Sequence, residues 1–259
     1  MTKKQLTVAA CGIGRMGCLV ASIARERGHR VALELSSMTN VEGSGLTPNA
    51  LRGVDVVLEF SRASAALLNA RRAAEAGCAV VVGTKGWESE STAQAEFARL
   101  AEVHGVGILA APNFSLGMRV FRKIVEAAAA AASADEELDL WIEEVHHAGK
   151  ADHPSGTALM LARVALERLP RKREILTELP AGAVPRDRLL VTSSRGGYEP
   201  GMHRVVIDGR EECITLVHQA RSRRAFAAGA VRAAEWLAGR RGLFTLDDML
   251  AGDGSGGNP

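Results

Sequence analysis

The residues best suited to chemistry lie in one short stretch of the chain. His146 and His147 are adjacent, and Lys150 follows three positions later. A histidine exchanges a proton near neutral pH, and a lysine beside it adds a fixed positive charge. A pair of this kind can protonate an anion that forms during a reaction.

A Pro-Ser-Gly-Thr turn follows these residues and opens an expected helix. The hydroxyls of Ser155 and Thr157, with the N–H groups around Gly156, form a site for an anion such as a carboxylate. Taken singly, a histidine at a strand end is usually solvated, and Ser-Gly-Thr is usually an ordinary helix cap. Adjacent histidines could also bind zinc, but no cysteine or H-E-x-x-H spacing supports that, so we predict no metal. The whole constellation indicates a catalytic site.

A glycine-rich loop near the start of the chain indicates a dinucleotide site. Gly12-Ile13-Gly14-Arg15-Met16-Gly17 follows a short apolar run and precedes apolar residues at helical spacing. In such a loop the first glycine allows a tight turn, the second lets the backbone approach a pyrophosphate, and the third lets the helix pack closely. The helix N-terminus then attracts the phosphates.

The choice between NADH and NADPH depends on the end of the second expected strand. A carboxylate about 20 residues after the glycines would bind the ribose of NAD. Glu34 is near that place, but Ser36 and Ser37 follow it. If the strand ends at Ser36, no carboxylate repels a 2′-phosphate. Both NADH and NADPH therefore remain open.

The elements around the glycine loop alternate between strand and helix for about 110 residues. This rhythm predicts a doubly wound, Rossmann-type α/β domain with a parallel sheet. Gly28 stands where the cap of the first helix belongs. The expected strands are 6–11, 31–35, 54–60, 79–82 and 106–110, and the expected helices between them include 63–76 and 91–104.

After residue 113 the rhythm changes to longer strands with fewer helices. We expect a second α+β domain with a mostly antiparallel sheet, in which Asp208-Gly209 forms a tight type I′ hairpin turn. The expected helices are 117–132 and 157–169, and the expected strands are 138–147, 203–207 and 212–218. A last helix at 226–237 should pack back on the first domain. The domains would be 1–113 completed by 224–251, then 114–223, with a disordered tail at 252–259.

Composition excludes several classes of protein. Lys and Arg total 32 and Asp and Glu total 30, and this near-balance disfavours a nucleic-acid partner. No apolar run approaches the ~20 residues that span a bilayer, so no membrane partner is expected. The four cysteines lie far apart, which disfavours a disulfide scaffold and fits a reducing compartment. We expect a soluble cytoplasmic protein.

The chain resembles the 4-hydroxy-tetrahydrodipicolinate reductase (dihydrodipicolinate reductase) family almost from end to end. Its Glu-x-His-x-x-x-Lys-x-Asp-x-Pro-Ser-Gly-Thr-Ala stretch, residues 144–158, is similar to the long and specific signature of that family. Other matching segments are Gly12–Gly17, Glu59-Phe60-Ser61-Arg62, Gly83-Thr84-Lys85-Gly86, Pro112-Asn113-Phe114-Ser115, Ser194-Arg195-Gly196-Gly197 and His218–Ala230.

The resemblance implies a reaction and a role for each matching residue. A nicotinamide cofactor would reduce an unsaturated cyclic imine dicarboxylate to tetrahydrodipicolinate, a step toward diaminopimelate and lysine. His146 would be the general acid/base and Lys150 its proton-donating partner. The grip on the substrate carboxylates would come from His147, Ser155, Gly156 and Thr157. The residues implied for the cofactor are Gly12, Ile13, Gly14, Arg15, Met16, Gly17, Ser36, Phe60, Ser61, Gly83, Thr84, Ala111 and Phe114. The family is typically tetrameric through its second-domain sheet, so a homotetramer is expected.

Departures from the family pattern keep two alternatives in view. Lys85 stands where threonine is usual, and together with Ser36 it motivates a diverged reductase of another cyclic imine or conjugated dicarboxylate. The second alternative is a non-catalytic, dinucleotide-sensing protein. Such a protein has no use for His146 and Lys150 together, so the reductase is the preferred hypothesis.

Overall fold

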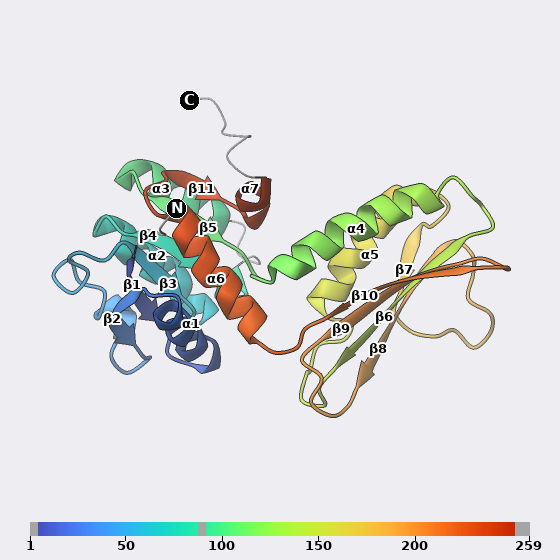
Figure 1. The fold of residues 1–259 in the computed structure, drawn as a ribbon, viewed down its shortest axis with the longest axis horizontal. Helices are drawn as coiled ribbons and strands as arrows, with labels where there is room; N and C mark the ends of the chain where they lie inside the picture. Colours follow the sequence, from blue (N-terminus) through green and yellow to red (C-terminus); the bar gives the residue numbers. More distant parts are fainter. Residues whose placement is uncertain (1–4, 88–91, 252–259) are drawn as a thin grey trace. The chain divides into compact units, whose positions relative to one another are not determined.

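The computed structural model describes residues 5–87 and 92–251, which form two compact units. One unit takes the described residues up to Leu116 and those from Arg223 onward, so two separate segments build it (Figure 1). The other unit runs from Gly117 to Ser222. The disordered tail expected at 252–259 lies outside the described residues.

The first unit contains a six-stranded sheet in the order β11-β5-β4-β3-β1-β2, with every neighbouring pair parallel. The doubly wound α/β fold predicted from the sequence is confirmed. Its elements are β1 (Thr7–Cys11), α1 (Arg15–Glu26), β2 (Arg30–Leu35), η1 (Val41–Gly43), β3 (Val56–Glu59), α2 (Ala63–Glu75), β4 (Ala79–Val82), α3 (Ala93–His104), β5 (Gly107–Ala110), α6 (Arg224–Leu237), β11 (Gly242–Phe244) and α7 (Leu246–Ala251).

Helices cover both faces of this parallel sheet. Every residue of β3 and β4 is buried, as expected for central parallel strands with helices on each side. One face packs against apolar residues of α2 and α3, such as Ala70 and Phe97. The other packs against α1 and α6, through residues such as Val20 and Ala230. The last predicted helix, now α6, therefore packs on the first unit as expected.

The second unit contains a five-stranded sheet in the order β10-β9-β6-β8-β7. Its elements are α4 (Leu116–Ala132), β6 (Asp139–His146), α5 (Gly156–Arg168), β7 (Glu174–Leu176), β8 (Arg188–Arg195), β9 (Met202–Asp208) and β10 (Cys213–Gln219). The β6–β9 and β9–β10 pairs are antiparallel, but the β6–β8 and β7–β8 pairs are parallel. The sheet is thus mixed rather than mostly antiparallel, because α5 carries the chain back so that β7 and β8 run alongside β6.

The β9–β10 hairpin is present, but its predicted turn is wrong. Strand pairing continues to the Asp208–Cys213 pair, and the Gly209 N–H then donates to the Glu212 carbonyl at 2.9 Å. The chain therefore reverses at Arg210 and Glu211. Gly209 is not among the glycines with a positive φ, so Asp208-Gly209 does not form a type I′ turn.

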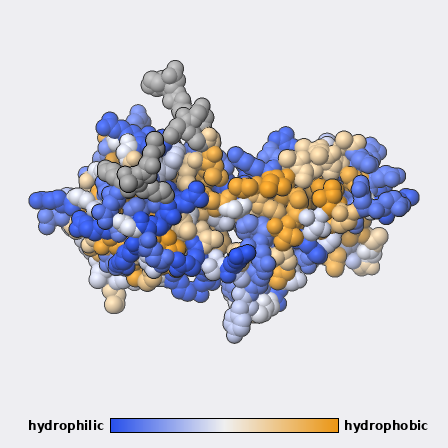
Figure 2. Space-filling view, in the orientation of Figure 1, coloured by the Kyte–Doolittle hydropathy of each residue, from blue (hydrophilic) through white to orange (hydrophobic). Residues whose placement is uncertain are grey.

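Helices α4 and α5 cover one face of the second sheet. Their apolar residues pack against alternate residues of β6, β8 and β9, such as Leu140, Val191 and Val205. Figure 2 shows hydrophobic residues along α4, where the side chains of Val120 and Ile124 are exposed by 52% and 46%. Helix α4 therefore buries one apolar face in the core and keeps a second apolar strip at the surface.

The helices and the cysteines bear on where such a chain could function. Within residues 5–87 and 92–251, no helix combines the length and the apolar character needed to cross a membrane. The four cysteines are free: Cys11 and Cys78 are buried, and Cys18 and Cys213 are exposed.

Candidate active site

The residues implied for the cofactor gather along one edge of the parallel sheet. Because parallel strands end at a common edge, residues that directly follow these strands come close together. Strand β1 lies between β2 and β3, so the order of the strands reverses beside it, which is where such folds bind nucleotides. The residues at this edge are Gly12 after β1, Ser36 after β2, Phe60 and Ser61 after β3, Gly83 and Thr84 after β4, and Ala111 and Phe114 near the end of β5.

The glycine loop is tightly packed at two of its glycines and open at the third. Gly12 has a φ of +92°, and a Cβ built on it would lie 2.5 Å from the backbone of Phe60. A Cβ on Gly17 would lie 2.0 Å from the Gly12 carbonyl oxygen, whereas one on Gly14 meets nothing within 4 Å. The loop is therefore closely packed at Gly12 and Gly17, whereas the space beside Gly14 is open. Gly14 is also the N-cap of α1 and offers no side-chain cap, so the first N–H groups face outward for a ligand.

A buried carboxylate fixes the hydroxyls beside this edge. Glu59 is fully buried at the end of β3, and the Ser61 hydroxyl donates to its Oε1. Its other oxygen accepts from the Thr84 hydroxyl at 2.5 Å, and Asn69 donates to Oε1 at 3.2 Å. Burial raises the pKa of the Glu59 carboxyl, although these hydrogen bonds oppose the rise. The network holds Ser61 and Thr84 in place.

An aromatic wall lies at the same edge. A Cβ on Gly83 would lie 2.2 Å from the Phe60 ring, so this ring occupies the space that a side chain would need. The Phe60 and Phe114 ring centroids are 6.1 Å apart and tilted by 51°. Flat apolar surfaces of this kind suit a planar nicotinamide ring.

Strand β6 positions the first histidine of the second unit. Its residues alternate between half-buried and buried, and Glu144 and His146 share the buried face. The Nδ1 atom of His146 lies 3.1 Å from Glu144 Oε2. Its Nε2 atom faces Gly201, where a Cβ would lie only 3.0 Å away. A side chain at position 201 would therefore crowd Nε2, and the glycine lets the chain pass close to this nitrogen.

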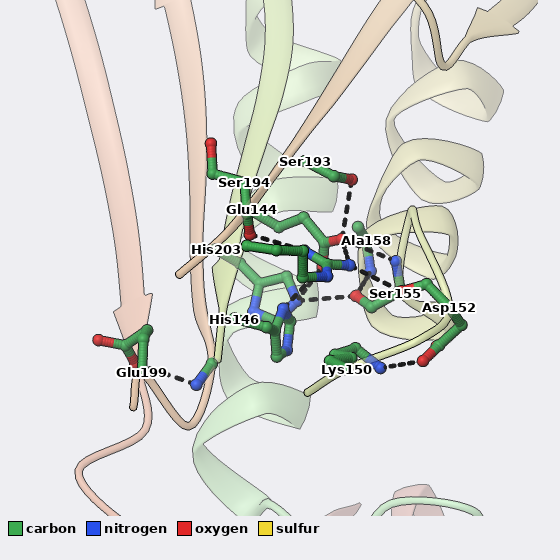
Figure 3. A network of polar contacts seen from close by, with 12 residues as sticks. Glu144, His146, Lys150, Asp152, Ser155, Ala158, Ser193, Ser194, Glu199 and His203 are labelled. Carbon is green, nitrogen blue, oxygen red and sulfur yellow. Dashed lines mark hydrogen bonds and ion pairs between the residues drawn. The ribbon is translucent and has the colours of Figure 1, made fainter. Parts of the chain in front are cut away.

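The Pro-Ser-Gly-Thr turn caps α5 and contacts the same carboxylate (Figure 3). The Ser155 hydroxyl accepts from the Ala158 N–H at 3.1 Å, which makes Ser155 the N-cap. Its own N–H donates to Glu144 Oε1 at 2.9 Å. Gly156 is exposed and Thr157 is half-buried in the first helical turn. Because Ser155 is committed to Glu144 and Ala158, an anion at the start of α5 can meet Gly156 and Thr157 instead.

Lys150 and His147 lie in the turn that follows β6. The Lys150 ammonium contacts the Asp152 carboxylate at 2.5 Å, and its backbone N–H donates to the His147 carbonyl at 3.1 Å. The His147 N–H donates to the Glu199 carbonyl at 2.7 Å. His147 is half-buried, and it follows the last residue of β6. Both residues therefore directly follow the strand that carries His146.

Burial and hydrogen bonding act in opposite directions on the buried groups here. Burial alone would raise the pKa of Glu144, but contacts from His146, Ser155 and Arg195 outweigh it and hold this pKa well below its usual range. Burial and the nearby His146 lower the pKa of His203 to about 4. At neutral pH the site therefore contains an ionised Glu144 and a neutral His203.

Glu144, His146 and His203 also have the spacing of a metal site. One ligand atom from each lies within 4.8 Å of the other two, and all three residues are buried. However, Arg195 donates to the same carboxylate at 2.7 Å. A guanidinium at this distance neutralises Glu144 and opposes a second cation, so the cluster is better described as a hydrogen-bonded ion pair.

Comparison with known proteins identifies the family. Two family models match the chain: dihydrodipicolinate reductase, N-terminus, over residues 6–114, and dihydrodipicolinate reductase, C-terminus, over residues 117–250. The chain belongs to the dihydrodipicolinate reductase family. It is 38% identical to the 4-hydroxy-tetrahydrodipicolinate reductase of Archaeoglobus fulgidus, covering 95% of this chain and all of the relative, and 39% identical to that of Myxococcus xanthus, covering 89% and 84%.

A solved structure agrees with this assignment at the level of the fold. Dipicolinate-bound dihydrodipicolinate reductase from Paenisporosarcina sp. TG-14 superposes with a TM-score of 0.69 at 21% identity, covering 93% of this chain and 98% of the other. As a member of the dihydrodipicolinate reductase family, the chain is an oxidoreductase that uses a nicotinamide cofactor. The predicted family is therefore confirmed.

The structure adds residues that were not singled out from the sequence of this dihydrodipicolinate reductase family member. Glu144, Arg195 and His203 surround His146, and Glu59 lies beneath the cofactor edge. Glu144 could have been found, because it stands two residues before His146 in a strand and so shares its face. The position of Arg195 follows only from the parallel pairing of β6 with β8, in which it lies opposite His146.

Ser36 and Lys85, the two residues that motivate a diverged reductase, both lie at the carboxyl edge of the first sheet. Strand β2 ends at Leu35, so Ser36 is the first residue beyond it. Glu34 lies within β2, and its carboxylate is paired with Arg25. Lys85 is exposed and follows Thr84 beyond the end of β4. Both departures therefore lie at the carboxyl edge of the sheet, among the residues implied for the cofactor.

Proposed function

We propose that this chain is a cytoplasmic enzyme that reduces the dehydrated form of 4-hydroxy-tetrahydrodipicolinate to tetrahydrodipicolinate, in the route to diaminopimelate and lysine. The observation that carries the proposal is the contact of one buried carboxylate, Glu144, with both His146 and the Ser155 turn. This contact joins a proton donor to an anion site on one unit, while the other unit offers the glycine loop. The two exposed free thiols, Cys18 and Cys213, fit a reducing compartment.

The chemistry of the reaction matches these groups. When bound at the carboxyl edge of the first sheet, the nicotinamide supplies a hydride. Hydride addition to a conjugated cyclic imine leaves an electron pair that must take up a proton. His146 delivers this proton from Nε2, and the ammonium of Lys150 stabilises the developing negative charge and returns a proton to the histidine. His147, Ser155, Gly156 and Thr157 hold the carboxylates of the substrate.

The proposal is tested with a coupled assay. A synthase would generate the unstable substrate from pyruvate and aspartate semialdehyde, and oxidation of NADPH or NADH would be followed at each substrate concentration. We expect oxidation that depends on both the synthase and this chain. Bound cofactor without oxidation would contradict the proposal and favour a diverged reductase, for which the exposed charge of Lys85 is the motivating observation.

We further propose that both NADPH and NADH serve as reductants. No carboxylate follows β2, because Ser36 is the first residue beyond it and Glu34 is occupied by Arg25. Ser36→Asp is expected to raise the KM for NADPH about tenfold or more and to change the KM for NADH by less than about threefold, because a carboxylate repels the 2′-phosphate. Equal changes for the two cofactors would show that Ser36 is remote from the ribose.

The open face of the second sheet supports a homotetramer, as expected from the family resemblance. Strand pairing aligns Thr192, Glu143, Arg204 and Val217 in one row on the face opposite α4 and α5, and Val217 is 55% exposed. The neighbouring Trp141 lies 5.4 Å beneath the Arg204 guanidinium and lines a cavity of about 300 Å³. We propose that other copies of the chain cover this face.

A charge on this face should break the assembly. Val217→Arg is expected to convert a tetramer of about four chain masses into smaller species in light scattering, because it places unpaired charges against one another at the interface. Ile124→Arg is the matched control, since Ile124 is similarly exposed but lies on α4. A tetramer that survives Val217→Arg, or a wild-type protein that is monomeric, would contradict the proposed interface.

A further inference from the structure

The carboxylate of Glu144 uses one oxygen to hold the start of α5 (Figure 3). Its Oε1 accepts from the Ser155 N–H at 2.9 Å and from the Ser193 hydroxyl at 2.9 Å. The Arg195 guanidinium donates to the same oxygen at 2.7 Å and also to the Asp152 carbonyl at 2.7 Å. Oε1 is therefore committed to the turn that would bind the anion.

The other oxygen faces the histidines. Oε2 lies 3.1 Å from His146 Nδ1 and 3.7 Å from His203 Nε2. Both Oε2 and His146 Nδ1 are buried, and neither has a hydrogen-bond partner of good geometry among the described residues, although the two atoms lie 3.1 Å apart. Buried polar atoms without partners are costly, so each of these two atoms is the natural partner of the other.

We infer that Glu144 is a positioning residue that fixes the tautomer of His146 and ties this histidine to the anion-binding turn at Ser155. An ionised carboxylate only accepts hydrogen bonds, so Nδ1 of His146 must carry a hydrogen. The second nitrogen, Nε2, is then the one that gives up a proton and takes it back, and it lies next to Gly201, where a side chain would crowd it. The inference rests on the proposed function, since that function makes His146 the proton donor.

The surrounding groups support this division of roles. His203 is the other imidazole beside Oε2, and its ring packs edge-on against His146 at 5.3 Å. Because burial lowers the pKa of His203 to about 4, His203 is neutral at working pH and is not the proton donor. The Ser155 hydroxyl lies 3.3 Å from His203 Nε2, so this ring also contacts the cap of α5.

The coupling has a consequence for catalysis. A movement of Glu144 would displace Ser155 and His146 together, because the same carboxylate contacts both. The proton donor and the turn that binds the substrate carboxylate therefore keep a fixed separation. Fixed geometry of this kind is what a proton transfer within a bound complex requires.

The test compares the same substitution at two glutamates of the second unit. Glu144→Gln removes the charge at nearly constant volume, and Glu126→Gln is the matched control, because Glu126 lies on α4 and pairs with Arg168. We expect Glu144→Gln to lower kcat by up to about 10⁴-fold, as loss of the orienting carboxylate does in catalytic triads. We expect the Kd for NADPH to be unchanged and the affinity for dipicolinate, used as a dicarboxylate probe, to fall about tenfold.

A spectroscopic readout separates positioning from folding. In protein labelled with ¹⁵N-histidine, the His146 signals, assigned with His146→Gln, should report the Nδ1–H tautomer in the wild type and a changed tautomer in Glu144→Gln. Glu144→Asp keeps the charge and should recover part of kcat. Circular dichroism spectra and thermal melting curves would establish that each variant is folded.

Each outcome decides the inference. An unchanged tautomer together with a kcat within about threefold of wild type would overturn it. Loss of wild-type activity on treatment with a chelator, restored by zinc, would also overturn it, because the three buried groups would then be metal ligands. A wild type without reductase activity would refute the proposed function. The His146 tautomer and the affinity for dipicolinate could still be measured in that case, and they would test the role of Glu144 separately.

Discussion

Replacing Lys150 by alanine is expected to lower kcat about 10²–10⁴-fold, the range over which a positioned acid or base accelerates a proton transfer. The ammonium lies in the turn beside His146, paired with the exposed Asp152. Because the first unit alone carries the glycine loop, the Kd for NADPH should be unchanged. Steady-state rates and a fluorescence titration with NADPH measure these two quantities separately.

Two further variants define what Lys150 does. Lys123→Ala removes an exposed lysine from α4 in the same unit and should leave kcat unchanged. Lys150→Arg keeps the positive charge but gives up the proton far less readily, so it should restore substrate affinity without restoring kcat. Full recovery of kcat in Lys150→Arg would show that the lysine acts through its charge alone. Full activity in Lys150→Ala would remove it from the mechanism.

Gly17→Ala is expected to abolish cofactor binding and to destabilise the first unit. A Cβ at this position would lie 2.0 Å from the Gly12 carbonyl oxygen, which belongs to the backbone and cannot rotate away. Overpacking of this kind costs about 1–3 kcal/mol and displaces the loop. We expect the Kd for NADPH to rise at least about 100-fold, with a lower melting temperature.

Gly14→Ala is the matched comparison. A Cβ there meets nothing within 4 Å, and the backbone of Gly14 is extended at a φ of −97°, so the variant should fold as the wild type does. It should nevertheless weaken NADPH binding, because the added methyl group occupies the space into which the pyrophosphate comes. Normal cofactor affinity in Gly14→Ala would place the phosphates elsewhere.

The first unit could be predicted from the sequence because its signals are local. The apolar runs of β1, β3 and β4 are short and almost entirely buried, and they are followed at the carboxyl edge by Gly12, Phe60 and Gly83. Gly28 follows the end of α1 with a φ of +86°, as its predicted position after the helix requires. Hydrophobic periodicity and glycine spacing were therefore sufficient to predict the fold of the first unit.

The second sheet was harder to predict because its pairing is not local. Strand β8 has an arginine at each end and hydroxyl residues only in its second half, and β7 has only three residues, so neither gives a clear strand pattern. Their parallel order depends on where α5 returns the chain. The prediction of a turn at Asp208-Gly209 was wrong for a related reason: Asp208 pairs with Cys213 and so belongs to the strand.

The candidate site divides in the same way. His146, Lys150 and Ser155 lie within ten residues of one another, and their residue types alone indicate proton transfer and anion binding. Arg195 and His203 come from β8 and β9, and only the folded sheet brings them to Glu144. Sequence reasoning therefore finds the groups that react, whereas the groups that hold them in place require the tertiary structure.

The specificity of the purified chain between two cyclic imines tests the central claim most directly. One substrate would be the synthase product with two carboxylates, and the other a six-membered cyclic imine with a single carboxylate. A site built around the Ser155 turn and Lys150 should prefer the dicarboxylate by about 10³-fold or more in kcat/KM, because the monocarboxylate leaves polar groups unpaired. Equal or better turnover of the monocarboxylate would contradict the account and would make the chain a reductase of another imine.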